Sequence, residues 1–532
     1  MACTTILVGK KASYNGATLM ARNDDSGSGH FMPKKWTVIN PKDQPVMYKS
    51  VISHVEIELP SDPLRYTSMP NAVSGEGIWA AAGVNSANVS MTATETITSN
   101  ERVLAADPLV LYNPSEYNDN DVYKLAMENT IKRKSEQSKN EHQESDSEGT
   151  PGGIGEEDLV AIVLPYIKTA REGVIRLGKL LETYGTYEMN AVGFSDVNEI
   201  WWLESIGGHH WIARRVPDDS YVIMPNQFGI DEFDIADAFG EQNDFMCSDD
   251  LCEFMMKYHL QLEMDKDLDE MDGVFNPRLA FGSHDDSDHC YNTPRAWYMA
   301  RYFNPDSYVW DGVDADFTPE SDDIPWSLIP EHKITSEDVK YILSSHYQGT
   351  PFDPYGRYGD HSENGKYRSI GINRTDFMGL MESRRDVPEP CCVIEWIAFA
   401  SNAFNAMVPF YANVTKTPKY MNVTGGTVTT ESFYWTSRMI AALADGADKH
   451  TGKALFAIET YQQDVQSKGR HIIEKTDDML REKRSRLAVT KIMEKANEEI
   501  AEMLRAEADK VLKAVLDEAS NNMKNQYSRS DA

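Results

Sequence analysis

The chain opens with two short apolar runs separated by a polar turn. Residues 4–9 are β-branched and apolar, residues 13–16 form the turn, and residues 17–23 form the second run. This pattern predicts an antiparallel hairpin of two strands. Pairing of the strands would bring Cys3 beside the segment 22–25, so that a thiol, a guanidinium and two carboxylates share a small volume.

Four further apolar runs lie near the middle of the chain. They cover residues 191–195, 199–204, 210–215 and 220–224, and Gly, Pro or Asp turns separate them. Such even spacing predicts one antiparallel sheet of four strands.

Helical periodicity appears in three segments. Residues 156–184 carry apolar positions three and four apart, with a break predicted at Pro165. Residues 431–449 and 471–526 are also predicted to be helical, and the second of these carries one apolar stripe. That stripe would cover the body of the protein or make a subunit contact.

The composition is that of a globular chain with an acidic excess. The 532 residues are enough to bury a large core. The net charge of −32 would repel nucleic acids and anionic membranes, so neither is an expected partner. No apolar run approaches the roughly 18–20 residues that cross a bilayer, and the first residues do not resemble a signal peptide. A cytoplasmic protein is expected.

The cysteines follow neither a disulfide pattern nor a zinc pattern. They stand at positions 3, 247, 252, 290, 391 and 392, and no second pair accompanies the pair at 247 and 252. Free thiols are therefore expected. The acidic run from His284 to His289 departs from the EF-hand pattern and is interpreted as a solvated loop. We expect neither a metal nor a cofactor.

Cys3 stands out among the thiols because it lies near the chain start and, in the hairpin, near Arg22. A cation beside a thiol lowers the pKa of the thiol and makes the nucleophilic thiolate available. If Met1 and Ala2 were removed, the α-amino group of Cys3 would itself be a base with an ordinary pKa of about 7.7–8.0. The structural alternative is a buried cysteine on an edge strand.

The residues around Cys3 resemble a known family. Cys-Thr-Thr-Ile-Leu-Val-Gly-Lys-Lys-Ala, followed by Ala-Arg-Asn-Asp-Asp, is similar to the start of the dipeptidases of peptidase family C69. These are N-terminal nucleophile (Ntn) cysteine hydrolases, related to bile-salt hydrolases, penicillin V acylases and secernins. Segments 169–178, 201–211, 349–356, 368–374 and 406–413 also resemble the family, and the resemblance extends from Cys3 to about residue 446.

The resemblance implies an α+β fold, the four-layer αββα Ntn-hydrolase sandwich of two antiparallel sheets. Residues 1–450 would form the catalytic domain, and residues 132–153 a charged, flexible loop within it. Residues 451–532 would form a C-terminal helical extension, packed on the body or at a subunit interface. A homo-oligomer is expected.

The resemblance also implies the site residues. Cys3 would be the nucleophile, Arg22 would tune its thiol, and Asp25 would orient the thiol or the α-ammonium group. Asn226 follows an apolar strand and would donate its amide to the oxyanion, while Arg295 would lie beside the nucleophile. Whether Asp24 or Asp25 carries the acidic role stays open. Three looser candidates for the oxyanion site, each also readable as an ordinary strand residue, are Asn85, Thr94 and Glu95.

The implied function is hydrolysis of dipeptides of broad side-chain type through a thioester on Cys3, after removal of Met1 and Ala2. One alternative is an Ntn acylase that cuts non-peptide amides of the bile-salt or penicillin V type. A second is a non-enzymatic, secernin-like scaffold. A third, a metalloprotease built on the His-rich loop, would be sensitive to chelators.

Overall fold

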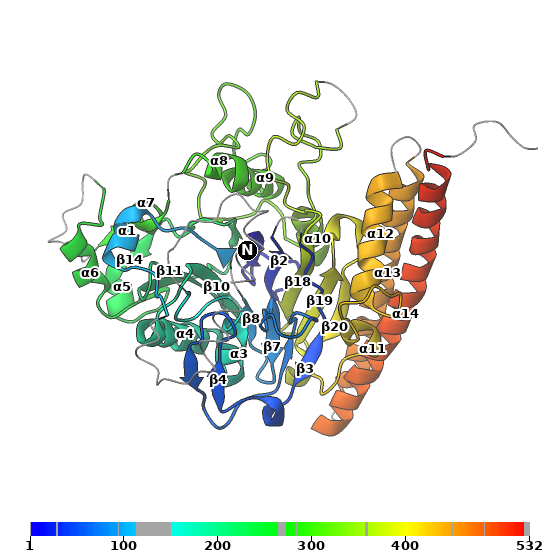
Figure 1. Cartoon of the computed structure of the whole chain (residues 1–532), viewed down its shortest axis with the longest axis horizontal. Helices are drawn as coiled ribbons and strands as arrows, with labels where there is room; N and C mark the ends of the chain where they lie inside the picture. The colour runs from blue at the N-terminus through cyan, green and yellow to red at the C-terminus, as the bar shows by residue number, and fades with distance from the viewer. Residues whose placement is uncertain are drawn as a thin grey trace, which may run out of the picture.

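Two antiparallel sheets lie face to face at the centre of the molecule, with helices on their outer sides (Figure 1). The computed structural model describes residues 2–27, 30–93, 95–112, 150–263, 273–283, 285–356, 360–447, 452–482 and 485–525. Residues 132–149 of the predicted loop, the candidate Thr94 and His284 lie outside the described residues. Within the described part, no helix is long and apolar enough to cross a membrane.

The first sheet has the N-terminal hairpin at its centre. Among the described residues it contains seven strands, in the order β17-β13-β1-β2-β18-β19-β20. Residues of β1 and β2 are buried because neighbouring strands flank them and the second sheet covers them. The strands are β17 (Ser327–Leu328), β13 (Tyr221–Met224), β1 (Ala2–Val8), β2 (Thr18–Asp25), β18 (Thr375–Ser383), β19 (Val393–Phe399) and β20 (Val408–Tyr411).

The second sheet packs against the hairpin. In the described chain it has nine strands, in the order β15-β12-β11-β10-β8-β7-β6-β3, with β9 also paired to β10. The two sheets approach closely at Gly193, where a Cβ atom would lie 2.8 Å from the sulfur of Met20. The strands are β15 (Phe245–Cys247), β12 (Trp211–Arg215), β11 (Ile200–Ser205), β10 (Asn190–Ser195), β8 (Ser90–Thr92), β7 (Ala82–Asn85), β6 (Tyr66–Ser68), β3 (Thr37–Ile39) and β9 (Glu95–Thr96).

The predicted four-stranded sheet is correct for three strands and wrong for the fourth. β10, β11 and β12 pair in sequence order, but β13 pairs with β1 in the other sheet. Three of the four residues of β13 are buried, so its apolar character fits either sheet. Its place beside β1 brings Asn226, two residues after the end of the strand, to the start of the hairpin.

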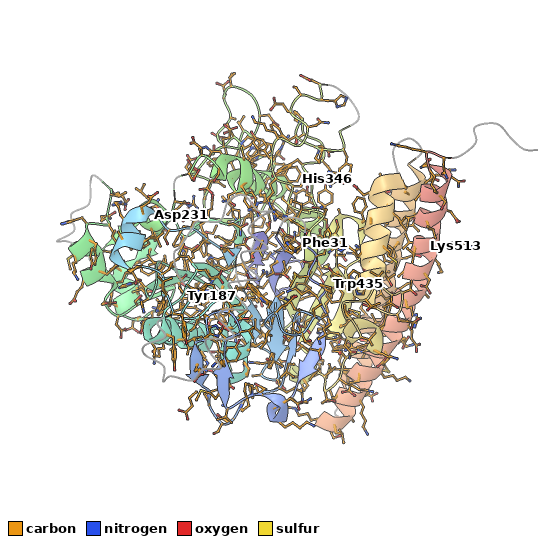
Figure 2. All side chains as sticks on the ribbon, viewed as in Figure 1. Phe31, Tyr187, Asp231, His346, Trp435 and Lys513 are labelled. Atoms are coloured by element: carbon orange, nitrogen blue, oxygen red, sulfur yellow. The ribbon has the colours of Figure 1, made fainter. Side chains whose placement is uncertain are left out.

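Helices cover the outer face of each sheet. On the nine-stranded sheet, α3 (Leu159–Val163) and α4 (Ala170–Tyr184) bury a separate apolar cluster, and the break predicted at Pro165 is present between them. On the seven-stranded sheet, α9 (Thr293–Phe303) packs on β13, and α10 (Ser336–Leu343) packs on β2 and β18. Side chains fill the space between these layers (Figure 2). The predicted α+β sandwich is confirmed.

The long C-terminal helix is divided in two. Five residues separate the end of α13 (Lys453–Leu480) from the start of α14 (Arg486–Asn521), so the segment predicted to be helical over 471–526 belongs to two helices. Ser485 caps α14 by accepting a hydrogen bond from the backbone N–H of Ala488, which starts a new helix there. Both helices pack on β20 beside α12 (Phe433–Ala447), on one side of the molecule (Figure 1). The domain division at residue 450 and the homo-oligomer stay predictions.

Short elements complete the described fold. They include two small strand pairs outside the main sheets and several helices of four to eight residues. They are α1 (Glu101–Ala106), α5 (Ile235–Phe239), α6 (Leu251–Tyr258), α7 (Pro277–Phe281), α8 (Asp288–Tyr291), α11 (Lys419–Asn422), β4 (Met47–Lys49), β5 (Glu56–Glu58), β14 (Phe233–Asp234) and β16 (Val274–Phe275).

Candidate active site

The register of the hairpin decides which side chains meet Cys3. β1 and β2 pair as predicted, with Cys3 opposite Asp24 and Thr5 opposite Arg22. Because directly opposed residues of an antiparallel pair share a face, these four side chains point to the same side. Asp25 is one residue further along β2 and therefore belongs to the opposite face.

Arg22 lies at the centre of a buried group of charges. Its Nη2 donates to Cys3 Sγ at 2.7 Å and to Asp24 Oδ1 at 3.0 Å, and it lies 3.5 Å from Glu156 Oε1. The Lys34 Nζ atom lies 3.0 Å from the other oxygen of Asp24. The thiol and the two carboxylates lie close enough together to hold a cation, and Arg22 places its guanidinium beside all three.

The thiol of Cys3 is not activated in this unprocessed chain. Complete burial raises the pKa of Cys3, and the opposing effect of Arg22 is smaller. The carboxylates of Glu95, Asp24 and Glu156 raise the pKa further. Arg22 lowers the pKa of Cys3, which is the expected direction, but in this chain the effect of burial is larger.

The nearby carboxyls respond differently to burial. Burial raises the pKa of Glu95 to about 8 and that of Glu156 to about 7, against the lowering effect of Arg22 on both. Burial would also raise the pKa of Asp24, but Lys34 and Arg22 lower it below its ordinary value. Asp24 is thus the ionised carboxylate beside the thiol at neutral pH.

Asn226 holds the backbone nitrogen of Cys3. The Cys3 N–H donates to Asn226 Oδ1 at 3.1 Å, and Arg295 Nη2 donates to the same oxygen at 2.8 Å. The Asn226 amide nitrogen donates to the carbonyl of Thr96 at 3.0 Å. Asn226 therefore presents its carbonyl oxygen, rather than the predicted amide donor, to Cys3.

Arg295 reaches Cys3 from the first turn of α9. Its Nη1 donates to the carbonyl oxygen of Cys3, and also to Thr4 Oγ1 at 2.6 Å. Its Nη2 donates to Asn292 Oδ1 at 2.7 Å, and Asn292 makes no side-chain cap on the helix. Neutral oxygens thus accept from this cation at a helix N-terminus, where a positive charge is otherwise unfavourable. Burial, followed by the repulsion of Arg368, lowers the pKa of Arg295 to about 10.

The structure does not bring the side chain of Asp25 to the thiol. Its Oδ2 accepts a hydrogen bond from Arg368 Nη2, and its Oδ1 accepts from Thr375 Oγ1 at 2.5 Å. Asp24 occupies the position beside Cys3 instead. The alternation of side chains along a strand was the signal for this, because Arg22 and Asp24 lie two residues apart.

Of the looser candidates for the oxyanion site, Glu95 lies on the face of Cys3 and Asn85 does not. Asn85 donates to the carbonyls of Leu164 and Ile167, both at 2.8 Å, and so holds the end of α3 rather than the site. Glu95 is fully buried and accepts a hydrogen bond from Thr5 Oγ1 at 2.7 Å, on the face of Cys3. The sequence prediction did not assign Lys34, Glu156 or Asn292 to the site, and it gave Arg368 only as the first residue of a segment that resembles the family.

In this site a nucleophile lies at the start of a central strand, with its backbone nitrogen held by the partly buried Asn226 and its sulfur held by the buried Arg22. This arrangement suits a hydrolase that acts through its N-terminal residue. The model of peptidase family C69 matches residues 2–463. The chain is 50% identical to a dipeptidase of Bifidobacterium longum, with 100% of both chains covered. It is 46% identical to probable dipeptidase A of Streptococcus pyogenes serotype M3, again over 100% of both chains, and 40% identical to probable dipeptidase B of Lactococcus lactis over 99% and 98%.

The chain belongs to peptidase family C69. The family predicted from the residues around Cys3 is confirmed, and the chain is a cysteine-type peptidase.

Proposed function

We propose that the chain hydrolyses dipeptides, with Cys3 as the nucleophile and the α-amino group of processed Cys3 as the base. Its family and the names of its relatives support a dipeptidase. One observation carries the assignment to Cys3: its backbone nitrogen, which becomes the α-amine after cleavage, donates to Asn226 Oδ1 while its sulfur accepts from Arg22. Both reacting atoms of one residue are held in place.

The proposed reaction proceeds through a thioester. The sulfur of Cys3 attacks the scissile carbonyl carbon as the thiol proton passes to the α-amine. The resulting α-ammonium gives that proton to the leaving amine, so the C–N bond breaks and the acyl group stays on sulfur. Water then attacks the thioester with the α-amine as base, which releases the acid and restores the thiol.

Each predicted site residue has a role in this proposal. Arg22 stabilises the developing thiolate, because its Nη2 lies 2.7 Å from the sulfur. Asn226 and Arg295 position the α-amine and the first peptide unit. Asp25 acts indirectly: it lies opposite Ala2 of β1 and pairs with Arg368.

Maturation requires cleavage of the Ala2–Cys3 bond. We propose that the Cys3 thiol attacks the carbonyl carbon of Ala2, so that the acyl group moves from nitrogen to sulfur, and that water then releases the residues before Cys3. In this step the nitrogen of Cys3 gains a proton and becomes the free α-amine. The same nucleophile would then serve both maturation and catalysis.

Intact mass and dipeptide hydrolysis test the proposal together. The purified chain should lack Met1 and Ala2 and should lose activity on alkylation with iodoacetamide, whereas Cys3→Ala should keep Ala2 and hydrolyse nothing. Cys290→Ser is the matched control, because Cys290 is an exposed free thiol and its removal should leave activity unchanged. An active preparation that retains Ala2 would contradict the mechanism.

The same preparation separates the alternatives. Hydrolysis of bile-salt or penicillin V amides without hydrolysis of dipeptides would favour an acylase, which the comparisons do not favour. A processed chain inactive on every amide would favour a scaffold. The breadth of side-chain preference and the cytoplasmic location stay predictions.

A further inference from the structure

Three arginines meet around Tyr291, next to the proposed nucleophile. The guanidinium carbons of Arg295 and Arg368 lie 5.2 and 5.1 Å from the centre of the Tyr291 ring. Arg374 donates to the hydroxyl of Tyr291 at 2.9 Å. The ring thus lies among three cations, two of which contact its π-system.

The positive charge of this group exceeds its negative charge. In the parts of the chain that the structure describes, Arg368 pairs with Asp25, whereas Arg295 and Arg374 donate to neutral oxygens. Burial would raise the pKa of Tyr291, but Arg368, Arg295 and Arg374 together lower it. Such an excess of cations favours the arrival of an anion.

Arg368 also has an unused donor. Its side chain is only 5% exposed, and its Nε atom has no hydrogen-bond partner. A buried donor without a partner is unfavourable until something accepts from it. Tyr291 and Arg374 are only partly buried, so an anion can approach this group from solvent.

The cluster borders the backbone of the proposed nucleophile, Cys3. Arg295 donates to the carbonyl oxygen of Cys3, and Arg368 holds Asp25, the residue that pairs with Ala2 in the hairpin. An extended dipeptide spans about 7 Å. A dipeptide bound beside the Cys3 backbone would extend from the start of β1 toward these arginines.

We propose that Arg368 and Arg374 bind the free α-carboxylate of a dipeptide substrate. This inference rests on the proposed function and adds the side chains by which the enzyme recognises the C-terminal end of the substrate. An arginine fork suits a carboxylate, since two parallel N–H donors meet its two oxygens. A longer peptide or an amide would place a neutral group against buried cations, which would limit cleavage to dipeptides.

Comparison of a dipeptide with its amide tests the subsite. The processed enzyme should cleave Ala-Ala with a kcat/KM about 10- to 100-fold above that for Ala-Ala amide, as expected for loss of a hydrogen bond to a charged group. Arg374→Gln should raise KM for Ala-Ala about 10-fold, change kcat by less than about 3-fold and leave the amide value unchanged. Arg374→Lys should keep part of the preference. Arg470→Gln is the matched control, because Arg470 also donates to a tyrosine hydroxyl, at the far end of the hairpin.

The outcomes separate this inference from the proposed function. Equal cleavage of Ala-Ala and its amide by the processed enzyme would overturn the carboxylate subsite and leave the dipeptidase standing. Cleavage of neither would overturn both. An equal loss on both substrates in Arg374→Gln would also overturn the subsite. Independently of any variant, free alanine should inhibit the enzyme at least about 10-fold more strongly than alaninamide, and equal inhibition would contradict the proposal.

Discussion

Replacement of Glu95 by glutamine should make the protein more stable at alkaline pH and leave it unchanged at acidic pH. Burial raises the pKa of Glu95 from an ordinary 4.5 to about 8. Between these values the folded chain holds a proton that the unfolded chain has released, so stability falls as the pH rises from 4.5 to 8. Glutamine cannot ionise and should escape this loss. Its amide can replace the carboxyl without losing a hydrogen bond, because only one oxygen of Glu95 has a partner.

The size of the effect follows from the shift in pKa. At about 1.4 kcal/mol per pKa unit, full ionisation of Glu95 costs about 5 kcal/mol above pH 8. An unfolding entropy of about 2.1 cal/mol/K per residue gives about 1.1 kcal/mol/K for 532 residues. The melting temperature of Glu95→Gln should therefore exceed that of the parent by about 4 °C at pH 9 and match it at pH 5.

Differential scanning calorimetry from pH 5 to pH 9 measures this difference. Glu395→Gln is an informative control, since Glu395 is equally buried, also has a pKa of about 8, and lies away from Cys3. Both carboxyl oxygens of Glu395 accept hydrogen bonds, from Thr67 and Trp36. Glu395→Gln should therefore destabilise the chain at pH 5, whereas Glu95→Gln should not. A difference between parent and Glu95→Gln that is constant with pH would refute the reasoning.

Three further predictions concern other buried groups. Arg22→Met should cost about 3–5 kcal/mol of unfolding free energy, because it removes the cation shared by buried Asp24 and Glu156, and an unchanged melting temperature would contradict this. Asn226→Ala should lower kcat about 10²-fold with little change in KM, as expected for a misplaced α-amine, so steady-state kinetics showing only a KM effect would argue against its positioning role. Burial lowers the pKa of Lys340 from an ordinary 10.5 to about 7, so the stability of the protein rises with pH between 7 and 10.5. Lys340→Met should therefore raise the melting temperature more at pH 6 than at pH 9.5, and the opposite order would exclude a buried, titrating amine.

Local patterns in the sequence were enough to predict the hairpin but not its surroundings. The two apolar runs and the turn gave the pairing of β1 with β2, and the period of two along a strand would also have selected Asp24 over Asp25. The resemblance supplied Asn226 and Arg295, which the structure brings to Cys3 from more than 200 residues away. Their placement depends on β13 crossing to the hairpin's sheet.

The contacts that could not be predicted are those set by packing between distant elements. Glu156 and Lys34 approach Arg22 and Asp24 only because the two sheets stack face to face. Arg368 reaches Asp25 across 343 residues of sequence. A single sequence shows the charge of such residues, but the local pattern around each residue does not show which of many possible partners the fold brings to it.

The charges around Cys3 give maturation a physical meaning in the proposed mechanism. In the unprocessed chain the nitrogen of Cys3 is a peptide nitrogen, which cannot take the thiol proton, and the raised pKa of the thiol keeps that proton on sulfur. Cleavage before Cys3 would turn this nitrogen into a base held by Asn226, and its protonated form would add a cation to the residue whose thiol pKa Glu95 and Glu156 raise. A cation there favours thiolate and carboxylates alike. The carboxylates that suppress the thiolate before cleavage would then stabilise the ammonium ion formed with it, so one broken peptide bond would convert an inert thiol into a nucleophile.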